Sequence, residues 1–560
     1  MGIGTTRELD RIASSVGVLQ EATPEFLPAN NVCNAGVLFL IPALLSQGLL
    51  KVFTILEPLR KGYYGLLSIL LVLTFMFLSR IKCPEQLKTC KVGELGKLLG
   101  LDRVPEAKCL RNKIDQIVCQ QKSDEVIRAL SRDWIDKEDA SFFYIDGHVQ
   151  VYHGYQGNLP KRYVSREKLC LAGTTEFWVN DELGMPFMIV TGELNEKLKT
   201  AMLEQIVPAL LRQTEGRVAQ RQLDTDPALA RFTLVFDREA YDLSFFKHLW
   251  DTYRIAVLTY RKAVKDNWPA SDFADHTTSV IGKSVVMKLC EKPWEHNGCK
   301  MREIRRLSEN GHQTSIITTL RQANMEMLAG KMFSRWSQEN FFRYMVQDYA
   351  LDRMTQYGVE EVNPEKEIVN PSYKTLTYRI KKQREKLARL KAKLFTKMED
   401  GLGVDIDGVK QQLHQQSQLQ DSITCYEREI EELYAKRKTV PYYMKVKDMP
   451  ADARYNKLKT ESKLFMNTIR MIAYRAETAI ANLIAPSYAR SAEEGRMLVK
   501  EIIKSDADMI PDYETQTLTL RLHSLSTPRA NNAAKELCVL LNETETVFPG
   551  SDLRMIYQTV

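Results

Sequence analysis

At 560 residues the chain is too long for one hydrophobic core, so two to four domains are expected. Its composition, 44% hydrophobic and 27% charged with 27 Gly and 20 Pro, is that of a globular protein and excludes wholesale disorder. The net charge of +7 is small for this length, so it permits a nucleic-acid partner without requiring one.

The ten cysteines are scattered, and Cys83 and Cys90 are the only close pair. No CxxC or CxxH pair occurs, so a zinc site is not expected. Scattered cysteines in a large chain are usually reduced core residues, and the first 30 residues lack the apolar segment of a secretory signal. We therefore expect a cytoplasmic protein.

Two apolar stretches stand near the start of the chain. Tyr63–Ser79 holds 17 residues without a charge, at the short end for a membrane-spanning helix, and Gly36–Phe53 contains Gln47 and Lys51. They suit either a pair of buried helices or a helical hairpin in a bilayer, and length alone favours the buried pair.

Residues 1–137 as a whole have the periodicity of packed helices, which predicts an N-terminal α-helical domain. Within it, residues 93–102 and a helix through Leu110, Ile114 and Ile117 suit a DNA-binding helical module. The same pattern suits plain helix packing, so the sequence alone does not choose between them.

At Ser141 the hydrophobic period changes from about 3.6 to 2, which predicts strands. An amphipathic helix follows at 198–213, and another is expected at 325–351. Strands mixed with helices predict an α/β or α+β domain around a buried sheet, at 138–261 plus 320–360. The expected strands are Phe142–Asp146, Val149–His153, Phe187–Val190, Phe232–Asp237 and Ile255–Tyr260. Residues 262–319, with strand-like runs at Ser284–Cys290 and Thr314–Leu320, are expected to form a β-rich insertion.

Residues 371–400 carry ten Lys and Arg against three Asp and Glu, a net +7 that equals the charge of the whole chain. Leucines recur there at helical spacing, and a second amphipathic helix follows at 411–438, which predicts a basic helical hairpin or short coiled coil over 365–440. The basic face could contact a nucleic-acid backbone or be an ordinary solvated face. Its candidate DNA-binding residues are Lys381, Lys382, Arg384, Lys386 and Arg389. The remaining 441–560 predict a C-terminal α+β region.

Three acidic residues stand out as candidates for chemistry. Asp146 and Asp237 each follow an apolar strand, where a side chain points into the crevice at the strand ends. Glu339 lies on a later helix with a large apolar face. Hard divalent cations prefer carboxylate oxygens, and such clusters catalyse phosphoryl transfer with two metal ions. Two carboxylates would equally suit a sugar hydrolase, so the pattern alone leaves the reaction open.

The same segments, in this order, resemble the DDE insertion-sequence transposases with an RNase-H-like catalytic core and a β insertion before the Glu. The first Asp matches Tyr-Ile-Asp146-Gly-His, the second matches Phe-Asp237-Arg-Glu-Ala-Tyr241, and Arg335 lies four residues before Glu339 as the pattern requires. Intervals of 91 and 102 residues between the acids also fit. Further similar stretches are Gly93–Asp102, Tyr152–Gly154, Trp178–Asn180 and Leu525–Ala530.

The sequence departs from that pattern at two positions. Met332 stands where the pattern has Tyr, and Val346 where it has Lys. The missing Lys removes a phosphate contact of the family, for which Arg343 is the candidate replacement.

The resemblance implies a multidomain α+β protein whose RNase-H-like mixed α/β core is flanked by helical domains. Asp146, Asp237 and Glu339 would hold two Mg²⁺ ions, with Mn²⁺ as a substitute, and Asp146 would bridge both. The supporting residues would be Arg335, to orient Glu339 or meet a phosphate, His148, to approach the phosphate, and Tyr241, although each also suits a structural role. In the insertion, Trp268 and Trp294 could stack on a flipped base, but buried Trp is the commoner case.

The implied reaction is hydrolysis at the 3′ ends of a mobile element, followed by strand transfer into target DNA. The implied partner is double-stranded DNA, both the element ends and the target, bound by a dimer. The implied location is the cytoplasm at the nucleoid, with no membrane, and the N-terminal helices would recognise the ends. Two alternatives remain open at this point. One is a DNA-binding protein derived from a transposase that has lost catalysis, and the other is a membrane-anchored helical protein.

Overall fold

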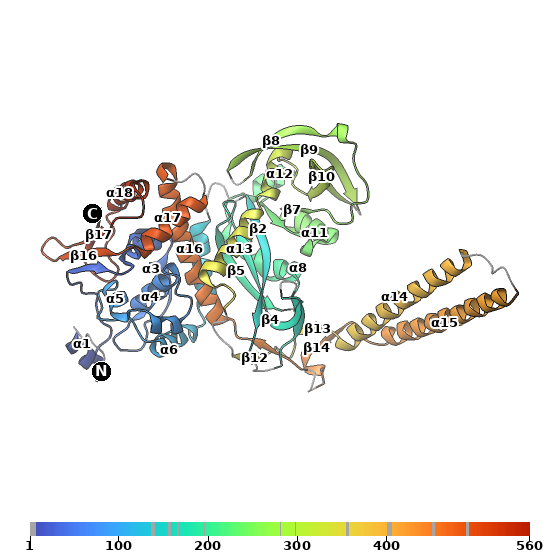
Figure 1. Ribbon diagram of the computed structural model, residues 1–560, viewed down its shortest axis with the longest axis horizontal. Helices are drawn as coiled ribbons and strands as arrows, with labels where there is room; N and C mark the ends of the chain where they lie inside the picture. The colour runs from blue at the N-terminus through green and yellow to red at the C-terminus, as the bar shows by residue number, and fades with distance from the viewer. Residues whose placement is uncertain are drawn as a thin grey trace. The chain divides into compact units, whose positions relative to one another are not determined.

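The computed structural model describes residues 7–135, 141–154, 158–164, 167–194, 196–280, 282–296, 298–353, 358–399, 406–450, 454–488 and 492–560. The chain divides into two compact units (Figure 1). Unit 1 comprises residues 1–154, 161–358 and 459–560, and unit 2 comprises 155–160 and 359–458.

Unit 1 is built around a ten-stranded sheet in the order β3-β4-β2-β6-β7-β11-β10-β9-β8, with β5 paired to β4. Antiparallel pairing joins β5, β4 and β2, whereas β2, β6 and β7 run parallel. The strands of this half are β2 (Phe142–Tyr152), β3 (Lys161–Val164), β4 (Leu169–Asn180), β5 (Pro186–Glu193), β6 (Phe232–Phe236) and β7 (Ile255–Tyr260).

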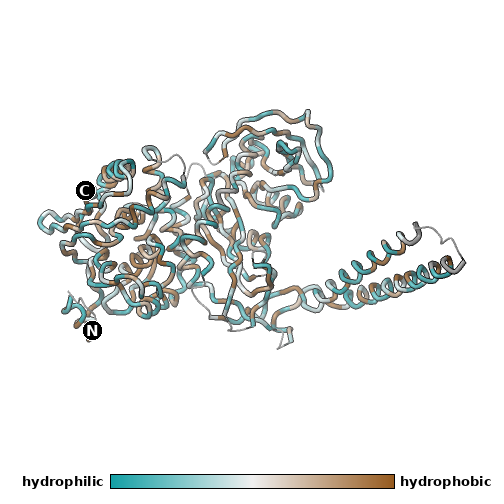
Figure 2. Tube along the Cα trace, viewed as in Figure 1, coloured by the Kyte–Doolittle hydropathy of each residue, from teal (hydrophilic) through white to brown (hydrophobic). Residues whose placement is uncertain are grey.

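The middle of this sheet is covered on both faces. Along β6, Phe232 and Leu234 belong to one hydrophobic cluster and Val235 to another, as the alternation of side chains in a strand requires. Helix α12 (Met325–Phe333) contributes to the second cluster, and α13 (Trp336–Tyr349) to the first. Figure 2 shows the central strands in brown, in keeping with a sheet whose core strands are hydrophobic.

The sequence predicts two strands over Phe142–His153, but the structure has one. Strand β2 continues through Asp146 and Gly147 because β4 pairs with it without a break from Tyr144 to Tyr152. The parallel neighbour β6 is shorter and ends at Phe236. Asp146 therefore lies at the end of the β2–β6 ladder rather than at the end of its own strand.

The predicted β-rich insertion extends the same sheet. Strand β11 pairs antiparallel with β7, and β8 to β11 form an antiparallel meander from there. The strands are β8 (Ala274–Val280), β9 (Lys283–His296), β10 (Cys299–Leu307) and β11 (Gln313–Thr318). Between the core strands lie α8 (Leu198–Ala201), a π-helical turn (Met202–Ile206), α9 (Val207–Gln213), α10 (Gln220–Thr225) and α11 (Leu243–Tyr253).

The two ends of the chain share one hydrophobic core, although the sequence predicts separate regions at 1–137 and 441–560. Helix α16 (Glu461–Tyr488) packs against α4 (Leu66–Leu78), and β1 (Ala29–Val32) pairs with β16 (Ala507–Asp512). Helix α4 is apolar on all sides and almost wholly buried, so its own region cannot cover it alone.

The other helices around this core are short. Before the sheet they are α1 (Glu8–Ser15), α2 (Ile41–Ser46), α3 (Leu49–Ile55), α5 (Val92–Lys97), α6 (Ala107–Val118) and α7 (Ser123–Trp134). After it come α17 (Ala492–Lys504), β17 (Thr517–Leu522), α18 (Pro528–Asn542) and β18 (Arg554–Thr559). Strands β1, β16, β17 and β18 form a four-stranded sheet in that order.

No single helix within the described part of the chain is long and apolar enough to cross a membrane. The pair Ala35–Ser46 and Leu49–Ile55 meets the length and composition criteria only when taken together, and it is bent by 61°. The apolar stretch singled out in the sequence, Tyr63–Ser79, contains α4, of whose 13 residues 11 are buried.

Unit 2 is a helical hairpin on a small β base. Helices α14 (Pro371–Glu399) and α15 (Ile406–Lys438) pack along one another. Their bases are joined by the two-stranded pairs β12–β15 and β13–β14, over a cluster of Val362, Val446 and Met449. These strands are β12 (Val359–Glu361), β13 (Glu367–Val369), β14 (Tyr443–Lys445) and β15 (Asn456–Leu458).

A buried ionic cluster joins α16 to the sheet in unit 1. The Glu176 carboxylate on β4 is fully buried, and the Lys463 ammonium lies 3.7 Å from it. Asn467 Nδ2 donates to Glu176 Oε1 at 3.2 Å, and Arg470 donates to Asn467 Oδ1 at 2.8 Å. Burial, reinforced by the nearby Arg470 charge but opposed by Glu176, lowers the pKa of Lys463 to about 8.

This depressed pKa predicts a pH dependence of stability. Between about pH 8 and pH 10.5 the folded protein releases the Lys463 proton before the unfolded chain does, so this residue makes unfolding harder as pH rises. The contribution is at most about 1.4 kcal/mol per pH unit. In thermal melts, the melting temperature of the wild type relative to that of Lys463→Met should rise between about pH 7.5 and 9.5. The exposed Lys535→Met serves as control, and a gap that stays constant with pH would contradict the assignment.

Candidate functional site

Asp146 and Asp237 lie side by side at one edge of the central sheet. Ile145 and Phe236 are partners in the parallel β2–β6 ladder. Asp146 directly follows Ile145, and Asp237 directly follows Phe236. Asp146 Oδ1 accepts a hydrogen bond from the Gly147 amide at 2.8 Å, and Asp237 Oδ1 accepts one from the Arg238 amide at 2.6 Å. Their side chains are 29% and 50% exposed, so both carboxylates can reach a ligand.

Glu339 joins this pair through Arg335. Glu339 lies in the first turn of α13, and Arg335 immediately precedes that helix. An Arg335 guanidinium nitrogen donates to Glu339 Oε1 at 2.9 Å. The same guanidinium lies 3.6 Å from Asp146 Oδ2 and 3.9 Å from Asp237 Oδ2. The structure thus gathers all three predicted carboxylates around one cation, and we call these four residues the carboxylate cluster.

The electrostatics of the carboxylate cluster favour a cation. Burial raises the pKa of Asp146 to about 6, helped by the negative charges of Asp237 and Glu239 and opposed by Arg335 and the Gly147 amide. A carboxyl group that is reluctant to ionise beside other acids is stabilised by added positive charge. The site therefore has the charge and the hard oxygen donors that Mg²⁺ prefers.

The carboxylates are not closed around a metal position in this structure. Among the described residues, no group of three or more His, Cys, Asp or Glu side chains is close enough to hold a metal ion. The position between the acids is instead approached by the Arg335 guanidinium, whose side chain is 10% exposed. The donor set fits a hard cation in chemistry, and holding one requires the acids to close in.

The carboxylate cluster has neighbours that were not predicted from the sequence. Tyr260 ends β7, the third parallel strand, and its pKa is raised by burial and modulated by Arg335, Asp237 and Glu339. The Arg238 guanidinium lies 5.6 Å above the Tyr260 ring, and Glu239 is 3.8 Å from Arg162. Its position could have indicated Tyr260, because it lies at the polar end of β7, beside the strands that lead to the two aspartates.

Two of the predicted supporting residues make other contacts. His148 Nε2 lies 2.7 Å from Asp352 Oδ1, and its ring stacks on Phe342 at 5.3 Å. Tyr241 packs edge-on against Phe246, with Lys262 over its ring. These contacts suit packing roles, and none of them involves a member of the carboxylate cluster.

The two departures from the family pattern face the protein interior. Met332 is fully buried in the cluster beneath α12, and Val346 is half-buried against the main core. Apolar side chains suit both environments. Arg343, the candidate replacement for the missing Lys, is 69% exposed and lies 3.7 Å from Glu493.

The tryptophans of the insertion are half-buried beside cations. Trp268 lies under the Arg305 guanidinium at 4.2 Å and the Lys292 ammonium at 4.8 Å. Trp294 stacks on His296 at 5.7 Å, with Arg261 at 4.8 Å from its ring. Both rings are thus already engaged by side chains of the chain itself.

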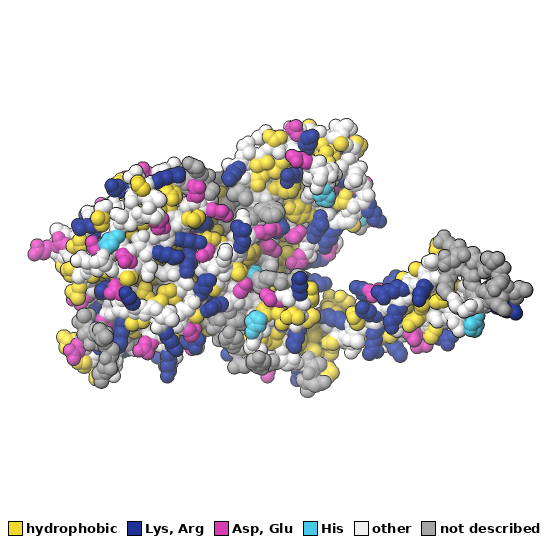
Figure 3. Space-filling model, viewed as in Figure 1, with side chains coloured by type: hydrophobic (Ala, Val, Ile, Leu, Met, Phe, Trp, Pro, Cys, Tyr) yellow, Lys and Arg dark blue, Asp and Glu magenta, His cyan; other side chains and the backbone are white. Residues whose placement is uncertain are grey.

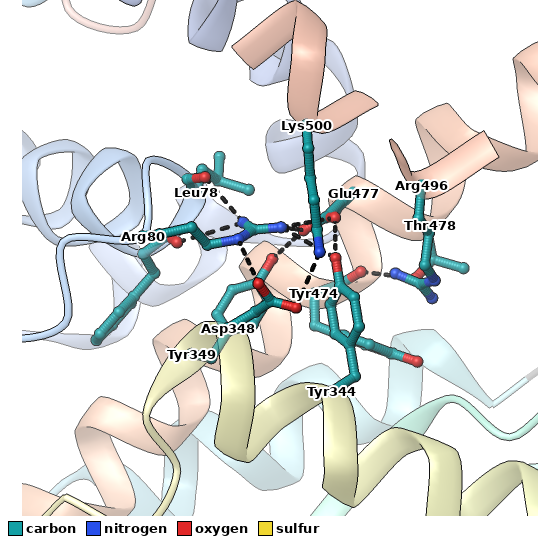
Figure 4. A network of polar contacts seen from close by, with 11 residues as sticks. Leu78, Arg80, Tyr344, Asp348, Tyr349, Tyr474, Glu477, Thr478, Arg496 and Lys500 are labelled. Carbon is teal, nitrogen blue, oxygen red and sulfur yellow. Dashed lines mark hydrogen bonds and ion pairs between the residues drawn. The ribbon is translucent and has the colours of Figure 1, made fainter. Parts of the chain in front are cut away.

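A buried polar network fixes the far end of α13 (Figure 4). The Glu477 carboxylate on α16 is fully buried. Arg80 donates to both of its oxygens, at 2.9 and 3.0 Å. Tyr344 and Tyr349 of α13 donate their hydroxyls to the same carboxylate. Asp348, next to Tyr349, pairs with Lys500 at 2.9 Å. The helix that carries Glu339 is therefore tied to both ends of the chain.

In unit 2, the predicted DNA-binding residues are exposed along α14. Figure 3 shows Lys and Arg side chains gathered on the hairpin. Glu385 lies 4.0 Å from Lys381 and 3.7 Å from Lys382, and Lys391 pairs with Glu427 of α15 at 2.7 Å. All five candidates on this helix are exposed: Lys381, Lys382, Arg384, Lys386 and Arg389.

Comparison with known proteins gives one match over nearly the whole chain. A family model described as "Transposase protein" matches residues 2–560. No curated protein matches the chain significantly. Among solved structures, the chain is similar to the piggyBac transposase in a synaptic complex with hairpin DNA, determined by cryo-EM, with 10% sequence identity and a TM-score of 0.29. That similarity covers 50% of this chain and 59% of the piggyBac chain.

Proposed function

The chain belongs to the transposase protein family, and from this premise we propose that it is a DDE transposase whose acids are Asp146, Asp237 and Glu339. The observation that carries the proposal is the convergence of these three carboxylates, far apart in sequence, on the single guanidinium of Arg335. Membership in the family supplies the reaction class, namely DNA cutting and strand transfer. The carboxylate cluster supplies the residues.

The strand order supports an RNase-H-like core within this proposal. In β5-β4-β2-β6-β7, the first strand along the chain is β2, which bears Asp146, and the fourth is β6, which Asp237 follows. The resemblance assigns its first and second Asp to those two strands. The topology and the motif positions therefore agree.

In the proposed reaction, water attacks a phosphodiester at each end of the mobile element. The bond to the 3′ oxygen breaks and leaves a free 3′-hydroxyl, which then attacks a phosphodiester of the target DNA. Two Mg²⁺ ions, or Mn²⁺ in their place, would activate the attacking oxygen and stabilise the leaving one when held by the three carboxylates. The side chains of Asp237 and Glu339 are 50% and 43% exposed and so accessible to DNA, whereas that of Asp146 is 29% exposed.

The proposed partners are double-stranded DNA, both element ends and target, and a second copy of the chain. We place the protein in the cytoplasm at the nucleoid, and assign recognition of the ends to the N-terminal helices. The test uses the DNA that flanks the gene. Oligonucleotides that carry its inverted repeats should be cut at the 3′ ends by the full chain with Mg²⁺ and left intact with EDTA. Intact DNA under both conditions would favour the alternative, a family member that binds DNA without cutting it.

The hairpin gives a prediction for nonspecific binding. Replacing Lys382, Arg384, Lys386 and Arg389 by Gln removes four exposed charges that we assign to phosphate contacts. Each lost contact should flatten the slope of log K against log salt by about 0.9, so the slope should fall by about 2–4. Fluorescence anisotropy with random-sequence duplex DNA, at about 50–300 mM NaCl, measures this slope.

The control for this experiment removes the same charge elsewhere. Lys168, Lys247, Lys504 and Lys535 are exposed residues of unit 1, and their replacement by Gln is expected to leave the slope near that of the wild type. Equal slopes for the wild type and the α14 variant would show that the hairpin has an ordinary solvated face.

A further inference from the structure

Arg335 holds an unusual position for a residue beside a cluster of acids. Its guanidinium contacts all three carboxylates, but only the contact to Glu339 Oε1, at 2.9 Å, is a hydrogen bond. The contacts to Asp146 and Asp237 are ion pairs of 3.6 and 3.9 Å. Within the described residues, its buried Nε has no hydrogen-bond partner. The guanidinium is therefore held among the acids by charge more than by directed bonds.

A guanidinium and a divalent cation cannot share this position. Arginine stays charged at any pH that a protein tolerates, so it cannot give way by losing a proton. Mg²⁺ needs carboxylate oxygens at about 2.0–2.1 Å and would meet a like charge within a few ångströms of its ligands. Arg335 occupies one of the two carboxylate oxygens of Glu339, a proposed metal ligand. Entry of a metal thus demands that Arg335 move away.

We propose that Arg335 is an internal counter-cation, which neutralises the three carboxylates in the metal-free protein and competes with divalent cations for them. This inference rests on the proposed function, because it assumes that the carboxylate cluster binds metal. Two consequences follow. The acids are kept from repelling one another while no metal is present, and metal binding is weakened by the work of displacing the guanidinium. A residue that only oriented Glu339 for metal would have the opposite effect, since its removal would loosen the ligand.

The helix geometry lets the guanidinium leave without disturbing the ligands. Arg335 precedes α13 and Glu339 lies within its first turn, so rotation of the arginine side chain leaves the helix backbone in place. The far end of α13 is fixed independently, by Tyr344 and Tyr349 on Glu477. Displacing Arg335 is therefore a side-chain event and does not require the helix to move.

The test measures Mn²⁺ binding to the full chain without DNA, by the electron paramagnetic resonance signal of the free ion. Arg335→Gln is expected to bind Mn²⁺ at least about tenfold more tightly than the wild type, which corresponds to the loss of about 1.4 kcal/mol of competition. Without metal, the melting temperature of Arg335→Gln should be lower than that of the wild type at about pH 8. Added Mn²⁺ should raise the melting temperature of the variant more than that of the wild type. Arg335→Met is measured beside it, because a neutral side chain of similar length tests the same charge should the glutamine variant fail to fold.

Two further variants define the outcome. Arg221→Gln removes an exposed charge from α10 and should bind Mn²⁺ like the wild type, whereas Asp237→Asn should weaken binding and so locate the ion at the carboxylate cluster. Equal or weaker Mn²⁺ binding by both Arg335 variants, with binding by the wild type intact, overturns the competition and leaves the proposed function standing. A folded wild type and Arg335→Gln that both bind no Mn²⁺ overturn the metal site and the competition together.

Discussion

Asp237→Ala is expected to lower the rate of DNA cleavage by at least about 10³-fold while leaving the fold and DNA binding in place. The side chain is 50% exposed, and two other carboxylates remain near Arg335 when it is lost, so its loss should cost little stability. Its carboxylate is one of the three proposed metal ligands, and the loss of transition-state stabilisation by several kcal/mol corresponds to that factor.

The measurement is the release of 3′ ends from a duplex that carries the terminal repeats, in Mg²⁺, followed on a denaturing gel. Asp251→Ala is a matched control, because Asp251 is 52% exposed in unit 1 and pairs with Lys247 on the surface of α11. Wild-type cleavage by the Asp237 variant would remove Asp237 from the active site. Cleavage lost equally in the Asp251 variant would indicate a general defect instead.

Glu477→Ala is expected to lower the free energy of unfolding by about 3–5 kcal/mol, the cost of leaving a partner charge buried without its counter-ion. The substitution strands the Arg80 guanidinium and the hydroxyls of Tyr344 and Tyr349 within the core (Figure 4). For a unit of this size the change corresponds to a melting temperature lower by about 3–5 °C.

Differential scanning calorimetry of the full chain measures this shift, with the exposed Glu536→Ala of α18 as control. Because the network holds the C-terminal end of α13, the Glu477 variant should also lose cleavage activity more steeply with temperature than the wild type. An unchanged melting temperature would mean that the contacts of Glu477 with Arg80, Tyr344 and Tyr349 do not stabilise the fold.

Much of the central fold could be predicted from the sequence. The apolar runs ending at Asp146 and Asp237 correspond to buried strands, and the basic block at 371–400 corresponds to α14. In both cases a local pattern is sufficient, because a strand buried on both faces is continuously apolar and a long helical seam repeats every three to four residues. The DDE assignment of the acids remains a prediction.

Other features could not be found from local patterns. Strand β4 was not predicted, because it begins with apolar residues that are exposed, Leu169 and Cys170, and its second half contains the buried Glu176, whose partners include Lys463 and Asn467 of α16. The continuity of β2 through Asp146 depends on pairing with that unpredicted strand. The three acids around Arg335 are spread over almost 200 residues of sequence, from Asp146 to Glu339, so local patterns cannot show that they meet.

The shared core of the two chain ends has a consequence for how the protein is made. Helix α4 leaves the ribosome early, but α16, which covers it, is synthesised about 380 residues later, or roughly 20–80 s at ordinary rates of elongation. Strand β1 waits still longer for β16. During that interval the face of α4 that α16 covers in the folded protein has only the neighbouring N-terminal elements to pack against. Glu477 can anchor α13 only after α16 has been synthesised, about 130 residues beyond α13 itself.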